Sequence, residues 1–302
     1  MEKIHIAINT KTKVLKELEK KFELTYFQEQ TFFEKLLLKE KKYADIYFHQ
    51  GSINTKALDM TEHSKITIVN SNSMKEKISE KRPYIKENKI FVLYPYINTQ
   101  IKYDKQIKRD FRKKYEIKKE QRIIYFTGKD LITSGLENFL ITIINLENKN
   151  YKILIDTNTQ QVEKLKERLK HFKLDKQTII LENYTNSDKL FIVSDIFIFP
   201  TKQKLFASSV LKAMFLKNAV FVSRDNGASE IIDSFSLIFG QNDKTLSFKV
   251  DAILGNKEEL KKIQKENYQV VKNMTLTNYI GELESIIEDN FLKESVSNSN
   301  PK

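Results

Sequence analysis

The chain has 302 residues, of which 40% are hydrophobic and 30% charged, and its net charge is +12. This composition excludes a disordered chain, and the length favours two domains of about 100–200 residues each. Because cysteine is absent, disulfides, cysteine nucleophiles and iron–sulfur clusters are excluded. The four histidines lack metal-ligand spacing, and no apolar run has the length of a membrane span. We therefore expect a cytoplasmic protein without a bound metal.

The excess of basic over acidic residues favours partners that carry phosphate, such as nucleic acid, anionic lipid headgroups or nucleotide substrates. The aromatic residues lie within apolar segments and do not alternate with basic residues, and no nucleic-acid-binding motif is present. We therefore do not expect nucleic acid to be a partner.

Short apolar segments alternate with amphipathic ones along the chain, and the order predicts strands and helices in turn. In the first half the predicted strands are 4–9, 24–27, 44–49, 65–70 and 89–94, and the predicted helices are 12–21, 30–41 and 73–80. In the second half the predicted strands are 122–128, 151–156, 177–183, 194–200 and 219–223, and the predicted helices are 135–147, 160–172, 187–193, 208–217 and 257–272. Strands that are apolar on both faces and alternate with helices indicate parallel sheets covered by helices. The fold class is therefore α/β, with two Rossmann-like domains facing each other across a cleft.

A basic segment marks the boundary between the two halves. Residues 102–122 contain ten Lys or Arg and four acidic residues. This favours an N-terminal domain over 1–100, a basic linker over 101–121 and a C-terminal domain over 122–290, followed by a disordered tail over 291–302. The segment is either a surface that attracts an anionic membrane or a nucleotide diphosphate, or a solvated linker and helix in a lysine-rich protein.

The common nucleotide fingerprints are absent, since there is no G-x-G-x-x-G, P-loop or G-x-S-x-G sequence. The most informative stretch is 194–232. Its loop 201–207 leads from the carboxyl end of a strand to a helix that begins near Ser208, where ligands bind in open α/β sheets. The N–H groups at such a helix start suit a diphosphate. Gly227 and Ala228 precede the next predicted helix and allow close backbone approach to a ligand.

This stretch resembles the C-terminal domain of retaining GT-B glycosyltransferases of the "group 1" family. Ser194–Thr201 matches the family's A-D-v-f-v-l-P-S block, and Phe206, Leu211, Ala213 and Met214 match the helix block that follows it. Asp225, Gly227, Glu230, Ile231 and Ile232 match D-x-G-G-x-x-E-i-i. Upstream, Gly128 and Lys129 resemble the family's strand ending in G-R, and the strand ending in His49 resembles its D-v-v-h-x-H strand. The resemblance covers residues 1–290, and the N-terminal domain is shortened.

The chain departs from the family at the donor site. Two glutamates eight positions apart, one on the donor sugar and one on the ribose hydroxyls, are Lys204 and Lys212 here. Lys129 replaces an arginine of the diphosphate clamp, and Ser134 replaces its lysine. The four positions sum to zero charge in the family and to +3 in this chain. A lysine ammonium accepts no hydrogen bond, so the family's ribose recognition cannot be reproduced at Lys212.

The resemblance implies a glycosyltransferase that moves a sugar from a nucleotide-sugar donor to a glycan or glycolipid acceptor in the cell envelope, with no metal or other cofactor. It places the donor against Gly128, Lys129, Lys204, Phe206, Ala207, Ser208, Lys212, Gly227 and Ala228, and assigns catalytic roles to His49 and Glu230. The alternative is a catalytically degenerate GT-B protein that acts as a binding or scaffold subunit of an active glycosyltransferase. Each side chain also has a structural interpretation: His49 as a buried histidine, Glu230 as a helix cap, and both lysines as solvent-exposed. The basic surface is consistent with the inner face of an anionic membrane.

Overall fold

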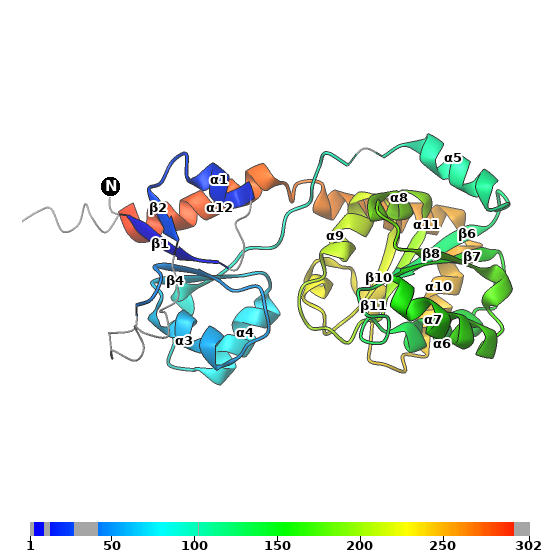
Figure 1. Cartoon of the computed structure of the whole chain (residues 1–302), viewed down its shortest axis with the longest axis horizontal. Helices are drawn as coiled ribbons and strands as arrows, with labels where there is room; N and C mark the ends of the chain where they lie inside the picture. The colour runs from blue at the N-terminus through cyan, green and yellow to red at the C-terminus, as the bar shows by residue number, and fades with distance from the viewer. Residues whose placement is uncertain (1–2, 9–12, 27–41, 102, 293–302) are drawn as a thin grey trace, which may run out of the picture. The chain divides into compact units, whose positions relative to one another are not determined.

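The computed structural model of the protein describes residues 3–8, 13–26, 42–101 and 103–292 (Figure 1). The chain forms two compact units. The first contains Met1–Tyr96 and Met274–Lys302, and the second contains Ile97–Asn273. Each unit is built on its own parallel sheet, which confirms the predicted α/β class. The helix predicted over 30–41 and the tail from 293 onward lie outside the described residues.

The sheet of the first unit has five described strands, all paired in parallel. Across the sheet they are β2 (Leu24–Tyr26), β1 (Ile4–Ala7), β3 (Ile46–Phe48), β4 (Ile66–Val69) and β5 (Ile90–Val92). Its helices are α1 (Lys13–Leu18), α3 (Thr55–His63), α4 (Asn72–Lys81), α12 (Leu276–Ile287), the 3₁₀ turn η1 (Glu87–Lys89) and the π-helical turn η5 (Glu288–Leu292). Asn54 and Ser71 cap α3 and α4 by accepting from backbone N–H groups.

The C-terminal helix α12 belongs to the first unit, although its sequence follows the second. Leu283 and Ile287 are fully buried in the same hydrophobic cluster as Ile4 and Leu18. Lys21 Nζ lies 2.5 Å from a carboxylate oxygen of Glu284, and Figure 1 shows α12 beside α1. This apolar face is buried in the core of the first unit, to which Met274–Lys302 belongs, so the predicted C-terminal domain over 122–290 is too long at its end.

The second unit has a six-stranded parallel sheet. Across the sheet the strands are β11 (Leu237–Ile238), β10 (Ala219–Ser223), β9 (Ile196–Phe199), β6 (Arg122–Thr127), β7 (Tyr151–Thr157) and β8 (Thr178–Glu182). Its helices are α5 (Lys105–Lys114), α6 (Leu136–Ile144), α7 (Thr159–His171), α8 (Ser187–Val193), α9 (Ser208–Phe215), α10 (Thr245–Gly255), α11 (Lys257–Val271), and the 3₁₀ turns η2 (Asp175–Gln177), η3 (Gly227–Ile231) and η4 (Ser234–Ser236). The strand order reverses between β6 and β9, which is where an open α/β sheet binds its ligand.

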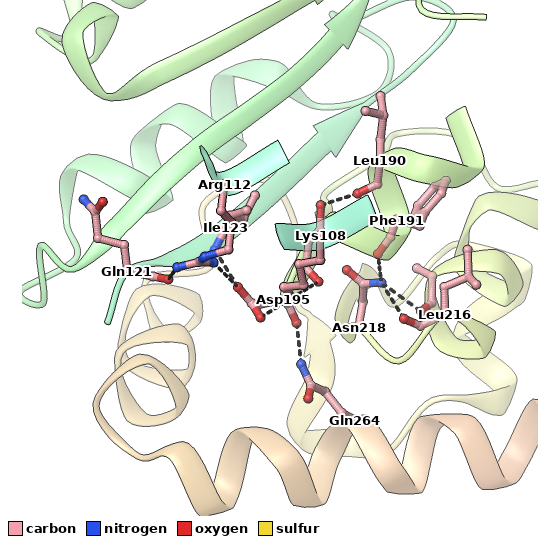
Figure 2. Close-up of polar contacts among 12 residues, drawn as sticks. Lys108, Arg112, Gln121, Ile123, Leu190, Phe191, Asp195, Leu216, Asn218 and Gln264 are labelled. Atoms are coloured by element: carbon pink, nitrogen blue, oxygen red, sulfur yellow. Dashed lines mark hydrogen bonds and ion pairs between the residues drawn. The ribbon is translucent and has the colours of Figure 1, made fainter. Parts of the chain in front are cut away.

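The segment predicted as a basic linker, 101–121, contains helix α5, which packs against α8 of the second unit. Asp195, at the start of β9, holds it in place (Figure 2). One carboxylate oxygen of Asp195 accepts from Lys108 Nζ at 2.7 Å, and the other accepts from the Ile123 backbone N–H at 2.9 Å. Gln264 Nε2 donates to the Asp195 carbonyl oxygen at 3.0 Å. Part of the basic charge is therefore structural, and the boundary lies at 96/97.

Within the part of the chain that the structure describes, no helix is long and apolar enough to span a bilayer.

Candidate functional site

A cavity of about 390 Å³ lies where the sheet of the second unit reverses its strand order. It is formed by the carboxyl ends of β6, β7 and β8 and by the first turns of α8 and α9. Its lining residues are Thr127, Gly128, Lys129, Asp156, Thr157, Asn158, Asn183, Tyr184, Ser187, Phe191, Ser208, Ser209 and Lys212. Four of the predicted donor-site residues, Gly128, Lys129, Ser208 and Lys212, thus share one cavity.

Gly128 follows β6 in a space that only glycine fits. A Cβ at this position would lie 1.9 Å from Ser134 Oγ, which itself belongs to a buried side chain. Ser134 thus packs under the Gly128 loop, where the resemblance places a lysine. The Lys129 ammonium remains as a cation of this loop, because Lys129 is exposed and lines the cavity.

The first turn of α9 opens onto the cavity with Ser208 and Ser209. The residue before it, Ala207, presents its N–H elsewhere and donates to Asn226 Oδ1 at 3.2 Å. Ser208 and Ser209, which line the cavity, lie in the first turn of α9, at the positive end of the helix dipole where backbone N–H groups lack intrahelical partners.

Asn226, which is 1% exposed, forms hydrogen bonds that connect the loop after β9 to the loop after β10. Its Oδ1 accepts from the N–H groups of Ala207 and Ala228, and its Nδ2 donates to the carbonyl oxygens of Gln203 and Leu205 at 2.8 and 2.7 Å. The Gly227 N–H donates to the Lys204 carbonyl oxygen at 3.1 Å. Because the N–H groups of Gly227 and Ala228 are used internally, these residues shape the loop beside the cavity and are not among its lining residues.

Lys212 lines the cavity but is already paired. Its Nζ lies 2.5 Å from Asp188 Oδ1 and 5.9 Å from the centre of the Phe191 ring. Asp188, from α8, thus restores a carboxyl group beside the position where the family has one. Lys129, Lys212 and Asp156 line the cavity, and Asp188, outside the lining, pairs with Lys212, so the cavity does not carry the +3 excess expected from four positions.

Other predicted residues lie outside the lining of this cavity. Lys204 is exposed on the loop after β9, and Phe206, on the same loop, is buried. Glu230 is exposed on η3, which is a single 3₁₀ segment where a helix was expected.

His49 belongs to the first unit, where it follows β3 and is 3% exposed. Its ring Nδ1 lies 2.9 Å from the Tyr47 hydroxyl, and its Nε2 is buried without a hydrogen-bond partner among the described residues. Burial lowers the pKa of His49, and a backbone hydrogen bond at Gly51 opposes the shift. Burial therefore favours the neutral imidazole, and one ring nitrogen has no partner among the described residues.

Asp156 is the acidic residue among those lining the cavity, and sequence reasoning did not single it out. It pairs in register with Thr127 across β6 and β7, directly before Gly128. Burial raises the pKa of the Asp156 carboxyl, and a hydrogen bond from the Tyr184 backbone N–H lowers it. The available signal was an acidic residue ending the apolar strand next to the Gly128 loop, a position that binds ribose in many doubly wound folds.

Two larger hollows, of about 520 and 770 Å³, lie against α6 and share Asn138, Ile141, Gln241 and Asn242. They lie away from the α9 start and include neither Lys129 nor Lys212, so we place the functional site in the smaller cavity. Among the described residues, no three His, Asp or Glu side chains are grouped to hold a metal ion. The expectation of a metal-free reaction remains a prediction.

The comparisons with known proteins agree with this geometry. The profile of the family "Glycosyl transferases group 1" matches residues 107–270. HepE of Anabaena superposes with a TM-score of 0.76 at 10% identity, covering 96% of this chain and 100% of that one. A glycosyltransferase of Rickettsia africae gives 0.71 at 17% identity, covering 95% and 89%. WaaG, a glycosyltransferase involved in lipopolysaccharide biosynthesis, gives 0.67 at 13%, covering 88% and 86%.

No curated protein sequence matches the chain. The family match nevertheless spans more than half of the chain, and its segment contains the whole cavity. The matches to these solved structures cover 88% to 96% of the chain, which confirms the predicted fold class. The chain therefore belongs to the glycosyl transferases group 1 family, and it is a glycosyltransferase with the GT-B fold.

Proposed function

We propose that the protein transfers a sugar from a nucleotide-sugar donor, bound in the cavity of the second unit, to a glycan or glycolipid acceptor of the cell envelope. The observation that carries the proposal is the meeting of the Gly128–Lys129 loop and the α9 start in one cavity at the strand-order reversal. HepE has been crystallised with UDP and with UDP-glucose, and WaaG acts in lipopolysaccharide biosynthesis, which supports the donor and acceptor classes.

The chemistry follows from charge placement. Transfer with retention passes through an oxocarbenium-like state and releases a nucleoside diphosphate, so the protein must stabilise negative charge on the leaving group. Lys129 and the N–H groups of Ser208 and Ser209 supply this stabilisation without a metal. In this proposal His49 acts on the acceptor side and Glu230 acts near the sugar.

A second function is supported by one departure from the family pattern. Lys204 and Lys212 stand where the resemblance expects glutamates, and Lys212 is held by Asp188. The alternative is therefore a degenerate GT-B protein that binds a donor or glycan and serves as a subunit of an active glycosyltransferase.

Thermal unfolding with UDP-, GDP-, ADP- and CMP-sugars tests the donor site. Ligand at 100 times its Kd adds about 2.7 kcal/mol, which raises Tm by about 5–10 °C. Lys129→Gln should abolish the shift, whereas Lys170→Gln, which removes an exposed charge on α7, should preserve it. Release of free sugar from the bound donor separates the two functions: hydrolysis supports the enzyme, and binding without hydrolysis or transfer supports the subunit. No shift with any donor at millimolar concentration contradicts the proposed function.

We also propose that the protein works at the inner face of an anionic membrane, through the solvent side of α5. Lys105, Arg109 and Lys113 are exposed there, whereas Lys108 and Arg112 face Asp195. Vesicles containing 30% phosphatidylglycerol should therefore co-sediment the protein, and reversing these three charges to Glu should release it. Reversing Lys261, Lys262 and Lys265 on α11 is the matched control. Equal loss in both variants indicates attraction by net charge and contradicts a role of α5.

A further inference from the structure

Asp156 occupies a position from which it can recognise a ligand. It lies beside Thr127 at the carboxyl end of neighbouring strands, and the loop that follows Thr127 carries Gly128 and Lys129. Its side chain is half-buried and lines the cavity, and it is the acid in that lining. A carboxylate in this place is adjacent to the groups proposed to bind a diphosphate.

The Asp156 carboxyl has few partners within the protein. Burial is the largest influence on its pKa, which is raised, and the opposing influence is the Tyr184 backbone N–H. Nearby polar atoms are also unsatisfied, since Thr157 Oγ1 and Asn158 Oδ1 are buried without hydrogen-bond partners. This edge of the cavity thus offers acceptors that a ligand with O–H or N–H donors would satisfy.

Lys212 does not provide such an acceptor. Its ammonium group donates only, and it is directed to Asp188 at 2.5 Å. Asp188 is not among the residues that line the cavity. A ribose carries two adjacent hydroxyl groups, each of which can donate to a carboxylate oxygen. Of the carboxyl groups at this site, that of Asp156 is the one that lines the cavity.

We propose that Asp156 is the ribose-recognising residue of this glycosyltransferase, accepting hydrogen bonds from the 2′- and 3′-hydroxyls of a bound nucleoside diphosphate. The inference rests on the proposed donor site and adds to it a residue that determines specificity for ribose. In doubly wound sheets with this strand order, an acidic residue at the end of the strand beside the phosphate loop plays this part. In this proposal the carboxylate that binds ribose lies at the end of strand β7, whereas the family pattern places it on the helix that carries Lys212 here.

The test compares ribose with 2′-deoxyribose in otherwise identical probes. Binding of UDP, GDP and ADP and of their 2′-deoxy counterparts is measured calorimetrically on the full chain, for the wild type, Asp156→Asn and Glu182→Gln. Glu182 is the matched control, because it is an exposed carboxylate that ends the neighbouring strand β8 outside the lining. Circular dichroism and Tm establish that both variants fold.

The wild type should bind the ribonucleotide of its preferred base about tenfold to a hundredfold more tightly than the deoxynucleotide, since one charge-assisted hydrogen bond is lost. Asp156→Asn should reduce this ratio to within about threefold by weakening the ribonucleotide more. Glu182→Gln should leave the ratio unchanged.

Two results would overturn the inference while leaving the donor site intact. Equal weakening of both nucleotides by Asp156→Asn would show a role in shape or charge alone. An unchanged ribose ratio with an altered preference among the bases would show that Asp156 contacts the base. If the wild type binds none of the probes at millimolar concentration, the donor site itself is contradicted, and the inference with it.

Discussion

At the scale of single residues, the charge that Lys212 brings to the donor site is offset by its ion pair with Asp188. In the sequence Lys212 reverses the charge expected at the donor site and suggests a cavity with excess positive charge. In the structure it lies 2.5 Å from Asp188, a residue 24 positions earlier on another helix. The pair is half-exposed, so its contribution to stability is small, on the order of 1 kcal/mol or less. Its larger effect is to keep the net charge of the cavity near balance.

The raised pKa of Asp156 predicts a pH-dependent cost to stability. Burial makes the folded state hold this proton more tightly than the unfolded chain, in which the pKa is near 3.8. The folded ligand-free protein therefore loses stability as the carboxyl ionises, from pH 3.8 upward through the raised pKa. Asp156→Asn should remove this cost, so the variant should be more stable than the wild type at pH 8 and the difference should shrink towards pH 4.5.

Urea unfolding of both proteins across this pH range measures the difference, with Glu182→Gln as the control at an exposed carboxylate. A variant that is less stable than the wild type at pH 8 would show that the ionised Asp156 carboxylate is satisfied within the protein. Together with the nucleotide experiment, a gain in stability accompanied by loss of ribose preference would identify a group retained for binding.

At the scale of elements, the loops beside the cavity depend on Asn226. Its amide donates to the carbonyl oxygens of Gln203 and Leu205 and accepts from the N–H groups of Ala207 and Ala228. Asn226→Asp keeps the size but replaces two donors by a charged oxygen that faces two carbonyl oxygens. We expect a loss of about 2–4 kcal/mol in the free energy of unfolding. Limited proteolysis should cut the 201–207 loop faster.

The same chemical change at Asn242, an exposed loop residue, is the control and should change stability by less than about 0.5 kcal/mol. Equal effects at the two positions would show that the four hydrogen bonds of Asn226 do not hold these loops.

The attachment of α5 depends on Asp195. Asp195→Ala leaves the Lys108 ammonium and the Ile123 N–H without their carboxylate, and should cost about 2–4 kcal/mol. Lys108→Met keeps the carboxylate bonded to Ile123 and close to Arg112, and should cost about 1 kcal/mol or less. Urea unfolding measures both. If Asp195→Ala is within about 0.5 kcal/mol of the wild type, α5 is held by its apolar contacts instead.

Hydrophobic periodicity predicted the elements whose apolar residues pack against a sheet formed by nearby segments of the sequence. The strands that end before Gly128 and Pro200 and the helix that begins at Ser208 were predicted within about two residues. For α5 a solvated linker and helix was one of the two interpretations, and what the sequence did not show is that Lys108 and Arg112 are used internally at Asp195. Helix α12 was not predicted, and its segment was assigned to the C-terminal domain, because local sequence does not show that Leu283 and Ile287 pack against strands more than 200 positions earlier.

The candidate site was also predictable only in part, because motif spacing locates strand ends and helix starts but not contacts between elements. Gly128, Lys129, Ser208 and Lys212 lie at strand ends and a helix start that motif spacing locates. Asp156 and Asp188 act through contacts between elements, so their roles appear only in three dimensions. Ala207, Gly227 and Ala228 were expected at the ligand, but their N–H groups serve the loops.

At the scale of the whole molecule, function follows from the division of the chain. The second unit is one continuous segment, Ile97–Asn273, that contains the complete cavity and the whole family match. The first unit is closed by α12 and contains His49. The donor site should therefore be assembled from the second unit's residues, and the acceptor-side role of His49 stays a prediction.

Hydrogen–deuterium exchange with and without a nucleoside diphosphate tests the central claim most directly, because it reports the place of binding as well as its occurrence. With UDP, GDP and ADP each at 5 mM, we predict that one of them slows exchange in 127–130, 156–158, 183–187 and 208–212, and leaves α6 and the 239–244 loop unchanged. Protection confined to α6 and the 239–244 loop, or no protection with any of the three, would contradict the assignment of the donor site.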